Sequence, residues 1–268
     1  RTPNVPAMLL ELLAHQNFED MKYGLDPAFR FTVSRAVYKG ILKFLSNRYG
    51  CPYVVQPLPV HGFAAEIKDK NTVHLSWKPT EDPLEPTAKA QSYWLYTRVD
   101  NGAFDDGVPV DGNAVDVKII DGHVYSWKVA AVNEGGFSFP SEILAAGVPS
   151  SGSLDHCVLV VNNFTRVGGP VWVDTEHYAG FNTNLDGGVP YISNPGYIGE
   201  MYEWRRDMKW KTDDDAGFGA SFLDHAGTPV AGNTFDFVAV HGKAILSSGH
   251  AFSSASSEWF ATSCESAW

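Results

Sequence analysis

A single carboxylate in an apolar run is the first residue of the chain whose type and position could do chemistry. Residues 5–13 are apolar except for Glu11. Such a run is typical of a strand covered on both faces. In an open α/β sheet, ligands bind at the carboxyl ends of the strands, and partial burial there can tune a carboxylate for proton transfer. Glu11 is therefore a candidate for proton transfer. From composition alone, however, a structural carboxylate that pairs with a basic residue or caps a helix is the favoured interpretation.

The residues after this run predict a helix and then a linker. Asp26 and Pro27 are typical of the N-cap and first turn of a helix. Apolar residues recur at a roughly helical period and predict that this helix ends near residues 47–50. Three prolines, Pro52, Pro57 and Pro59, then predict an extended linker.

Residues 5–45 as a whole resemble the C-terminal end of the zinc-dependent N-acetylmuramoyl-L-alanine amidases. Members of that family end with an apolar strand carrying a glutamate, then an Asn, an acidic pair and a closing helix with an Ala-x-x-x-Gly-Ile rhythm. In this chain Asn17, the pair Glu19–Asp20 and the helix residues 36–41 match that order. The resemblance implies that Glu11 corresponds to the catalytic glutamate.

The chain also departs from the family pattern at some positions, and another part of that pattern has no counterpart in it. Residues 13–16 read Leu-Ala-His-Gln where family members usually have Gly-Phe-Leu-Ser. The family's zinc ligands, two His and a Glu, lie upstream of the glutamate strand, and only residues 1–4 precede that run here. We therefore expect zinc only in the complete amidase domain and predict no metal or cofactor site in this chain. We therefore expect this multidomain chain to be a fragment, or the product of a longer precursor. Residues 1–57 are expected to be a partial α/β segment, the C-terminal strand and helix of an amidase-like domain plus a linker.

Short strands separated by turns fill residues 58–149. Runs rich in β-branched and aromatic residues predict strands at residues 72–77, 92–99, 115–119 and 124–133. Strands at this spacing predict an all-β sandwich. The loop at residues 79–89, with its prolines and acidic side chains, is expected to be a solvated turn, and a ligand site there is the alternative.

One motif in this region is specific enough to suggest a family. Tyr125-x-x-Lys128-Val129-x-Ala131-x-Asn133, together with the early Trp77, resembles the fibronectin type III module. Such modules usually serve as spacers or binding platforms. The resemblance implies a fibronectin type III-like β-sandwich over residues 58–149.

A different pattern begins after residue 150. Four apolar residues at 158–161 lead into Asn162 and Asn163, as in the first buried strand of an α/β domain. Further periodic patterns predict helices at residues 197–211 and 235–246, the second interrupted by Gly242, and a small-residue strand at residues 251–256. The prediction is a C-terminal α/β (Rossmann-like) domain over residues 150–268, expected to be incomplete. The order of the three parts is similar to that of Bacteroidetes proteins labelled amidase or xanthan lyase.

Several groups in this last region could bind ligands, each with a simpler interpretation. Asp213–Asp215 could bind Ca²⁺, but the spaced ligands of an EF-hand loop are missing, which favours a solvated turn. Gly217-Phe218-Gly219 is only part of a dinucleotide fingerprint and is rejected. His241 and His250 could join a metal site, although packing or surface histidines are the simpler interpretation. Aromatic residues could stack on sugars or fill the core: Trp172, Tyr178, Tyr197, Trp204, Trp210 and Trp259.

Composition narrows the possible partners. The net charge of −11 argues against nucleic acid or an anionic membrane as the main partner. No apolar run is long enough for a transmembrane helix. The three cysteines, Cys51, Cys157 and Cys264, are far apart and indicate neither a zinc knuckle nor a disulfide framework.

Two functional hypotheses follow from the sequence. The first is a fragment of a cell-wall-directed zinc amidase-like hydrolase, which would cleave an amide bond of peptidoglycan when complete and be inactive as this chain. The alternative is a non-catalytic scaffold that binds a glycan or a protein, related to the proteins labelled xanthan lyase. Both resemblances imply a location outside the cytoplasm. The sequence fixes neither the substrate of the C-terminal domain nor the oligomeric state.

Overall fold

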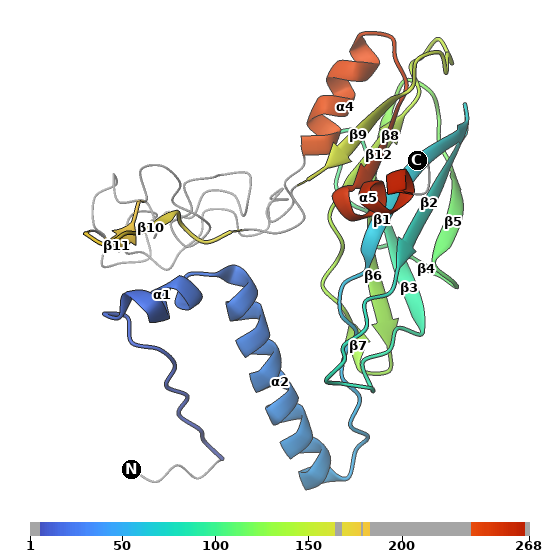
Figure 1. Cartoon of the computed structure of the whole chain (residues 1–268). Helices are drawn as coiled ribbons and strands as arrows, with labels where there is room; N and C mark the ends of the chain where they lie inside the picture. Colours follow the sequence, from blue (N-terminus) through green and yellow to red (C-terminus); the bar gives the residue numbers. More distant parts are fainter. Residues whose placement is uncertain (1–5, 164–167, 178, 183–236, 266–268) are drawn as a thin grey trace, which may run out of the picture. The chain divides into compact units, whose positions relative to one another are not determined.

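The structure, a computed structural model, divides the chain into two compact units (Figure 1). It describes residues 6–163, 168–177, 179–182 and 237–265. Among these described residues, unit 1 comprises residues 6–38, 168–177 and 179–182, and unit 2 comprises residues 39–163 and 237–265.

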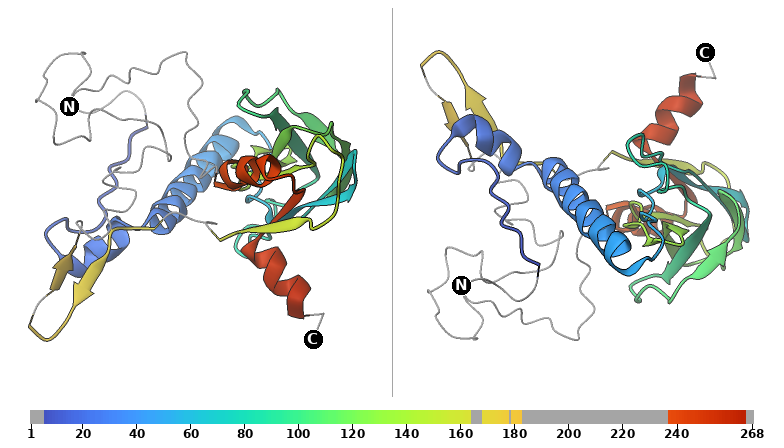
Figure 2. Two further views of the ribbon diagram at one scale, coloured as in Figure 1. Left: turned by 90° about the horizontal axis from the view of Figure 1, so that it is seen from above. Right: turned by 90° about the horizontal axis from the view of Figure 1, so that it is seen from below.

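Unit 2 contains a sandwich of antiparallel strands. One layer has the order β1-β2-β5, and the other has the order β4-β3-β6-β8 with β7 paired to β6. Figure 2 shows that these strands curl around a common interior. The bounds of the strands are β1 His61–Asp69, β2 Thr72–Lys78, β3 Ser92–Val99, β4 Val108–Val110, β5 Ala114–Lys118, β6 Val124–Asn133, β7 Gly136–Phe137 and β8 Leu144–Gly147. The strands predicted at residues 72–77, 92–99, 115–119 and 124–133 are confirmed.

Aromatic side chains fill the space between the two layers. Trp77 of β2 meets Tyr93 of β3 edge to face across the sandwich, with ring centroids 5.4 Å apart. Trp127 of β6 is fully buried, and its ring stacks on that of Tyr125. The Tyr125 hydroxyl accepts a hydrogen bond from the backbone N–H of Ile120 at 3.2 Å. A tyrosine that ties the start of its strand to the preceding corner in this way is typical of β-sandwiches.

The C-terminal part of the chain joins the two layers into one continuous sheet. Strand β12 (Phe252–Ser256) lies between β8 and β1, and β9 (Val158–Asn162) pairs with it in parallel. Helix α4 (Phe237–Ser247) packs on β8 and β9, and α5 (Ser257–Glu265) packs on β1 and β12 (Figure 1). The hydroxyl of Ser254 joins β12 to β8, since it accepts from Ala145 N–H at 3.0 Å and donates to the Ala145 carbonyl at 2.6 Å.

These elements test the predictions made for residues 150–268. The strand expected after residue 157, the helix expected at 235–246 and the strand expected at 251–256 are confirmed as β9, α4 and β12. The predicted interruption at Gly242 is wrong, because α4 runs through it. A side chain at that position would clash with the ring of Phe252, so the glycine allows a close approach of helix to strand.

The predicted Rossmann-like architecture is not confirmed. Within the described residues, β9 and β12 form the one parallel pair, and both belong to the mostly antiparallel sheet of unit 2. The division at residue 150 stays a prediction, since residues 183–236 lie outside the described part. The predicted helix at residues 197–211 therefore also lies outside the described residues.

The expected linker at residues 52–59 is a fixed part of unit 2. Val55 is fully buried, and its carbonyl accepts a hydrogen bond from the side-chain amide of Asn133 at 2.9 Å. The same amide group also donates to the carbonyls of Thr87 and Lys89. One side chain thus fixes two irregular segments against β6, because a buried amide must find partners for its donors.

Unit 1 contains a short helix, the first part of a long one and a hairpin. Helix α1 spans Phe18–Gly24, and α2 spans Pro27–Tyr49 and continues into unit 2. Their N-caps are Asn17, which accepts from the N–H groups of residues 19 and 20, and Asp26, which accepts from Ala28 N–H at 2.9 Å. The predicted helix start at Asp26–Pro27 is therefore confirmed. Strands β10 (Trp172–Asp174) and β11 (Ala179–Phe181) pair antiparallel.

The strand predicted at residues 5–13 is wrong for the described residues 6–13, which form neither strand nor helix. A strand needs a neighbour for its backbone hydrogen bonds, and the described residues supply none along this segment. Its apolar side chains are consequently uncovered: Met8 is 71% exposed and Leu9 is 82% exposed. The described helices, α2 included, do not combine the length and the apolar character needed to cross a membrane.

Candidate functional site

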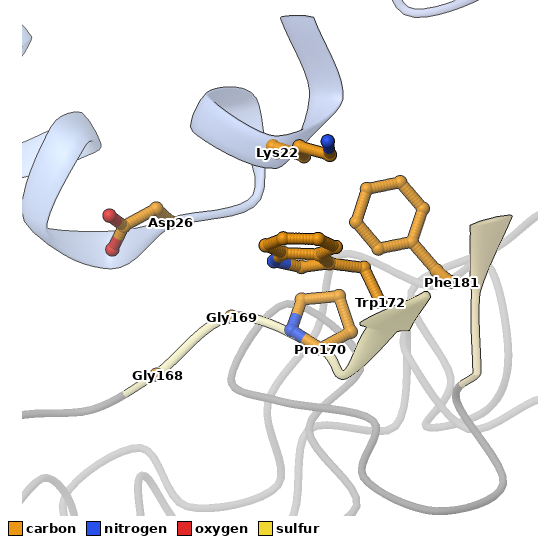
Figure 3. A pocket seen from close by; sticks show the side chains of 7 residues that line it. All are labelled: Lys22, Asp26, Gly168, Gly169, Pro170, Trp172 and Phe181. Carbon is orange, nitrogen blue, oxygen red and sulfur yellow. The ribbon is translucent and has the colours of Figure 1, made fainter. Parts of the chain in front are cut away.

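A hollow beside Trp172 is the best candidate for a binding site in unit 1 (Figure 3). Its volume is about 180 Å³. Its lining is Lys22, Asp26, Gly168, Gly169, Pro170, Trp172 and Phe181. Trp172 and Phe181 come from the two paired strands of the hairpin, Lys22 comes from α1, and Asp26 is the N-cap of α2.

Lys22 holds α1 against the hairpin. Its ammonium nitrogen lies 4.4 Å from the centre of the Trp172 ring and 4.6 Å from that of Phe18. The same nitrogen pairs with Asp174 at 2.7 Å and with Glu19 at 2.8 Å. The hydrogen bonds that Lys22 donates to these two carboxylates, the one to Asp174 first, raise the pKa of its amine. The amine is therefore a permanent cation at the wall of the hollow.

Phe18 supplies the remaining contact between α1 and the hairpin. Its ring lies edge to face with Phe181 at 5.2 Å and with Trp172 at 6.5 Å between ring centroids. Aromatic pairs prefer this arrangement because the positive edge of one ring meets the negative face of the other. The contacts fix the orientation of Trp172, although the side chain is still 50% exposed.

The hollow combines apolar ring surface with two opposite charges. Trp172, Pro170 and Phe181 provide the apolar surface, and the oppositely charged residues Lys22 and Asp26 also line the hollow. Ligand pockets that enclose a whole small molecule usually measure about 300–1,000 Å³. The hollow is smaller than that, and accordingly suits one ring of an extended ligand.

Glu11 is not among the residues that line this hollow. Its side chain is exposed, in the segment without regular structure. Among the described residues, no group of three His, Cys, Asp or Glu side chains is arranged to hold a metal ion. The catalytic role suggested for Glu11 stays a prediction.

The other site candidates from the sequence lie away from this hollow or outside the described residues. His241 is exposed on α4, whereas the ring of His250 lies edge to face with that of His156, 6.3 Å between centroids. Cys51 and Cys157 are free and exposed. Outside the described residues lie Tyr178, Tyr197, Trp204, Trp210, Asp213–Asp215 and Gly217–Gly219.

Trp172 is the aromatic residue for which core packing is the wrong interpretation, since half of its surface is exposed. Sequence reasoning missed its partners. Lys22 and Asp26 lie about 150 residues before Trp172 in the chain, and local periodicity carries no information at that separation. The only local signal for these two residues is the mixture of acidic and basic side chains at residues 19–26, which indicates a polar surface.

Comparisons with known proteins found likenesses only to parts of solved structures. No family model and no curated protein sequence matches the chain. Among solved structures, the FN5 domain of Drosophila Lar is 22% identical, with 33% of this chain and 92% of that one covered and a TM-score of 0.26. The fourth FNIII domain of a human protein is 19% identical, with 40% and 88% covered and a TM-score of 0.33. The twitchin kinase region from C. elegans is 21% identical, with 38% and 18% covered and a TM-score of 0.33.

This chain thus spans less than one fifth of the twitchin structure. These likenesses concern the fold alone. The strand order of unit 2, with β1-β2-β5 facing β4-β3-β6-β8, is that of a fibronectin type III-like β-sandwich.

Proposed function

We propose that the chain is a non-catalytic glycan-binding protein, and that the hollow beside Trp172 receives one sugar ring of the glycan. The observation that carries this proposal is the half-exposed, oriented indole of Trp172 at the wall of a small hollow with Lys22 and Asp26. The C–H face of a sugar packs on an aromatic ring, while its hydroxyls need both donors and acceptors. Peptidoglycan fragments are the first ligands to test, because the sequence resemblance is to peptidoglycan amidases.

The test measures binding of a peptidoglycan disaccharide and of chitotetraose by the whole chain. Trp172→Ala removes the ring and is expected to abolish measurable binding, while Asp26→Asn weakens it through loss of a charged acceptor. Phe260→Ala is the matched control, because it removes another partly exposed ring from α5. Equal binding by the wild type and Trp172→Ala would remove the hollow from the glycan site.

A second candidate function is the amidase-like hydrolase lineage, with Glu11 as its catalytic base. What supports it is the exposure of Glu11 in an uncovered apolar segment, together with the sequence resemblance. In a complete site, zinc would polarise the amide carbonyl and activate water. Glu11 would accept the proton of that water and pass it to the leaving amine. This role, like glycan binding to cell-wall material, implies a location outside the cytoplasm.

The hydrolase candidate is tested with the same chain, peptidoglycan and added zinc. We expect no release of free amine above a protein-free control, because the described residues offer no zinc site. Glu11→Gln is expected to leave folding and glycan binding unchanged, since the side chain is exposed. Zinc-dependent turnover that disappears in Glu11→Gln would make hydrolysis the function of this chain.

A further inference from the structure

We propose a second glycan site on the outer face of β3 and β6 in unit 2, where Lys128 binds the carboxylate of a uronic acid unit. The inference takes only the ligand class from the proposed function, because none of its residues belongs to the Trp172 hollow. It goes beyond that function in naming an acidic sugar and a separate surface.

The geometry of this face follows from the register of the two strands. Tyr96 of β3 lies opposite Lys128 of β6, and Trp94 lies opposite Ala130. The inward-facing neighbours Leu95 and Val129 are buried in the core. Alternation along the strands therefore places Trp94, Tyr96 and Lys128 together on the opposite face.

Aromatic rings surround the amine of Lys128. Its nitrogen lies 4.5 Å from the centre of the Phe104 ring and 5.2 Å from that of Tyr96. The guanidinium of Arg98 lies 4.9 Å from the same Phe104 ring. Two cations thus share one ring, and each strengthens the positive potential at the other.

Lys128 differs in its partners from Lys68 and Lys39, which both have carboxylates close by. Lys68 pairs with Asp116, and Lys39 lies near Asp82 and Glu85. Among the described residues no carboxylate pairs with Lys128, and burial, followed by the charge of Arg98, lowers the pKa of its amine. A half-buried cation of this kind gains most from an anion supplied by a ligand.

The rings beside Lys128 favour a sugar as the carrier of that anion. Trp94 is held by a hydrogen bond from its indole N–H to the Asp106 carbonyl at 2.9 Å and meets Phe137 edge to face at 5.7 Å. Trp94 and Tyr96 are partly exposed, and Phe137 is 47% exposed. Oriented rings next to a cation match a molecule with a flat C–H face and a single carboxylate.

The surrounding charges argue for isolated carboxylates rather than a dense polyanion. Asp105 and Asp106 lie in the loop that carries Phe104, and the whole chain has a net charge of −11. These charges repel polyphosphates and heavily sulfated chains. A glycan in which uronic acids alternate with neutral sugars carries fewer charges and meets the cation with a smaller repulsion.

The experiment compares a tetrasaccharide of alternating glucuronic acid and N-acetylglucosamine with chitotetraose, its neutral counterpart, by calorimetry on the whole chain. We expect the acidic ligand to bind about tenfold tighter, as one charge-assisted hydrogen bond predicts. The preference should weaken as salt is added. Lys128→Gln is expected to remove the preference, whereas Lys128→Arg keeps it. Lys70→Gln is the matched control, since it removes the same charge from the exposed β1–β2 turn.

The results of this experiment can be distinguished from those of the binding experiment on the Trp172 hollow. Loss of neutral-sugar binding in Trp172→Ala concerns the proposed function, and loss of the acidic preference in Lys128→Gln concerns this face. Equal affinities for the two tetrasaccharides would overturn the inference, as would an unchanged preference in Lys128→Gln. Binding of tetraglutamate or glutarate as tight as that of the acidic tetrasaccharide would show a carboxylate site without sugar recognition and would also overturn it.

Discussion

Unit 2 and unit 1 differ sharply in how they bury their side chains. In unit 2, large side chains from both layers are fully buried, among them Trp77, Trp127 and Phe63. In unit 1, Pro170 is the one buried residue among those described, and α2 has none. Caps, ion pairs and edge-to-face rings define the structure of unit 1. The stability of the molecule therefore resides in the sandwich, while the candidate site at Trp172 is held by polar and aromatic contacts.

The largest expected effect is in the sandwich core. Trp127→Ala removes a fully buried ring from β6 and is expected to lower the free energy of unfolding by about 3–5 kcal/mol. Chemical denaturation followed by circular dichroism measures it. A loss below about 1 kcal/mol would contradict the assignment of the core to this layer.

A pH effect of similar size is expected from Glu142. Burial, with a smaller contribution from the charge of Glu258, raises the pKa of Glu142 to about 7, and its buried Oε1 has no hydrogen-bond partner. The protonated acid is the better-tolerated form in the folded state. Its stabilising contribution is therefore full below the unfolded pKa and is lost as the pH rises through about 7, by about 3 kcal/mol in total.

The matched variant for this effect is Glu142→Gln, which keeps the shape and removes the titration. Denaturation at pH 5 and pH 8 should show a loss of stability in the wild type that is smaller in the variant. An equal pH dependence in both proteins would show that Glu142 is not the titrating group.

The junction of α4 with the sandwich should give the next largest effect. Gly242→Ala places a methyl group against the ring of Phe252 and is expected to cost about 1–3 kcal/mol through overpacking. The measurement is the midpoint of thermal unfolding. Ala244→Gly, at an exposed position of the same helix, is the control for helix propensity alone and should cost about 1 kcal/mol or less. A smaller loss for Gly242→Ala than for this control would show that α4 does not pack closely on β12.

The smallest effect is expected in unit 1. Leu9→Ser changes a side chain that is 82% exposed and should alter the free energy of unfolding by no more than about 0.5 kcal/mol. Denaturation under the conditions used for Trp127→Ala makes the two values directly comparable. A loss approaching that of Trp127→Ala would mean that the apolar segment at residues 6–13 has a buried role.

Local patterns predicted the sandwich well and the first segment poorly. The alternating strands and their turns carry their own signal, since each side chain faces either core or solvent at a period of two. The run at residues 5–13 has strand-like composition, but a strand also requires neighbours. The strand prediction for this run therefore required neighbouring strands, which the described residues do not supply.

Contacts between segments that are far apart in the chain could not be predicted from the sequence. Nothing local indicates that β12 lies between β8 and β1, or that Asn133 fixes the segment around Val55. Glu85, expected in a solvated turn, is nearly buried and bonds to Thr87 and Tyr53. Burial would raise its pKa, but these hydrogen bonds outweigh burial and the pKa is lowered. Similarly, Trp172 was a candidate from composition, whereas Lys22 and Asp26 became its neighbours only through folding.

In the proposed function, the Trp172 hollow binds a sugar while the sandwich provides the stable framework. This division can be tested by titrating the isotope-labelled chain with a peptidoglycan disaccharide and following the indole N–H resonances. We expect the Trp172 resonance to shift with saturable dependence on ligand, while those of the buried Trp77 and Trp127 stay in place. An unmoved Trp172 resonance at saturating ligand, or equal shifts at all three indoles, would contradict it.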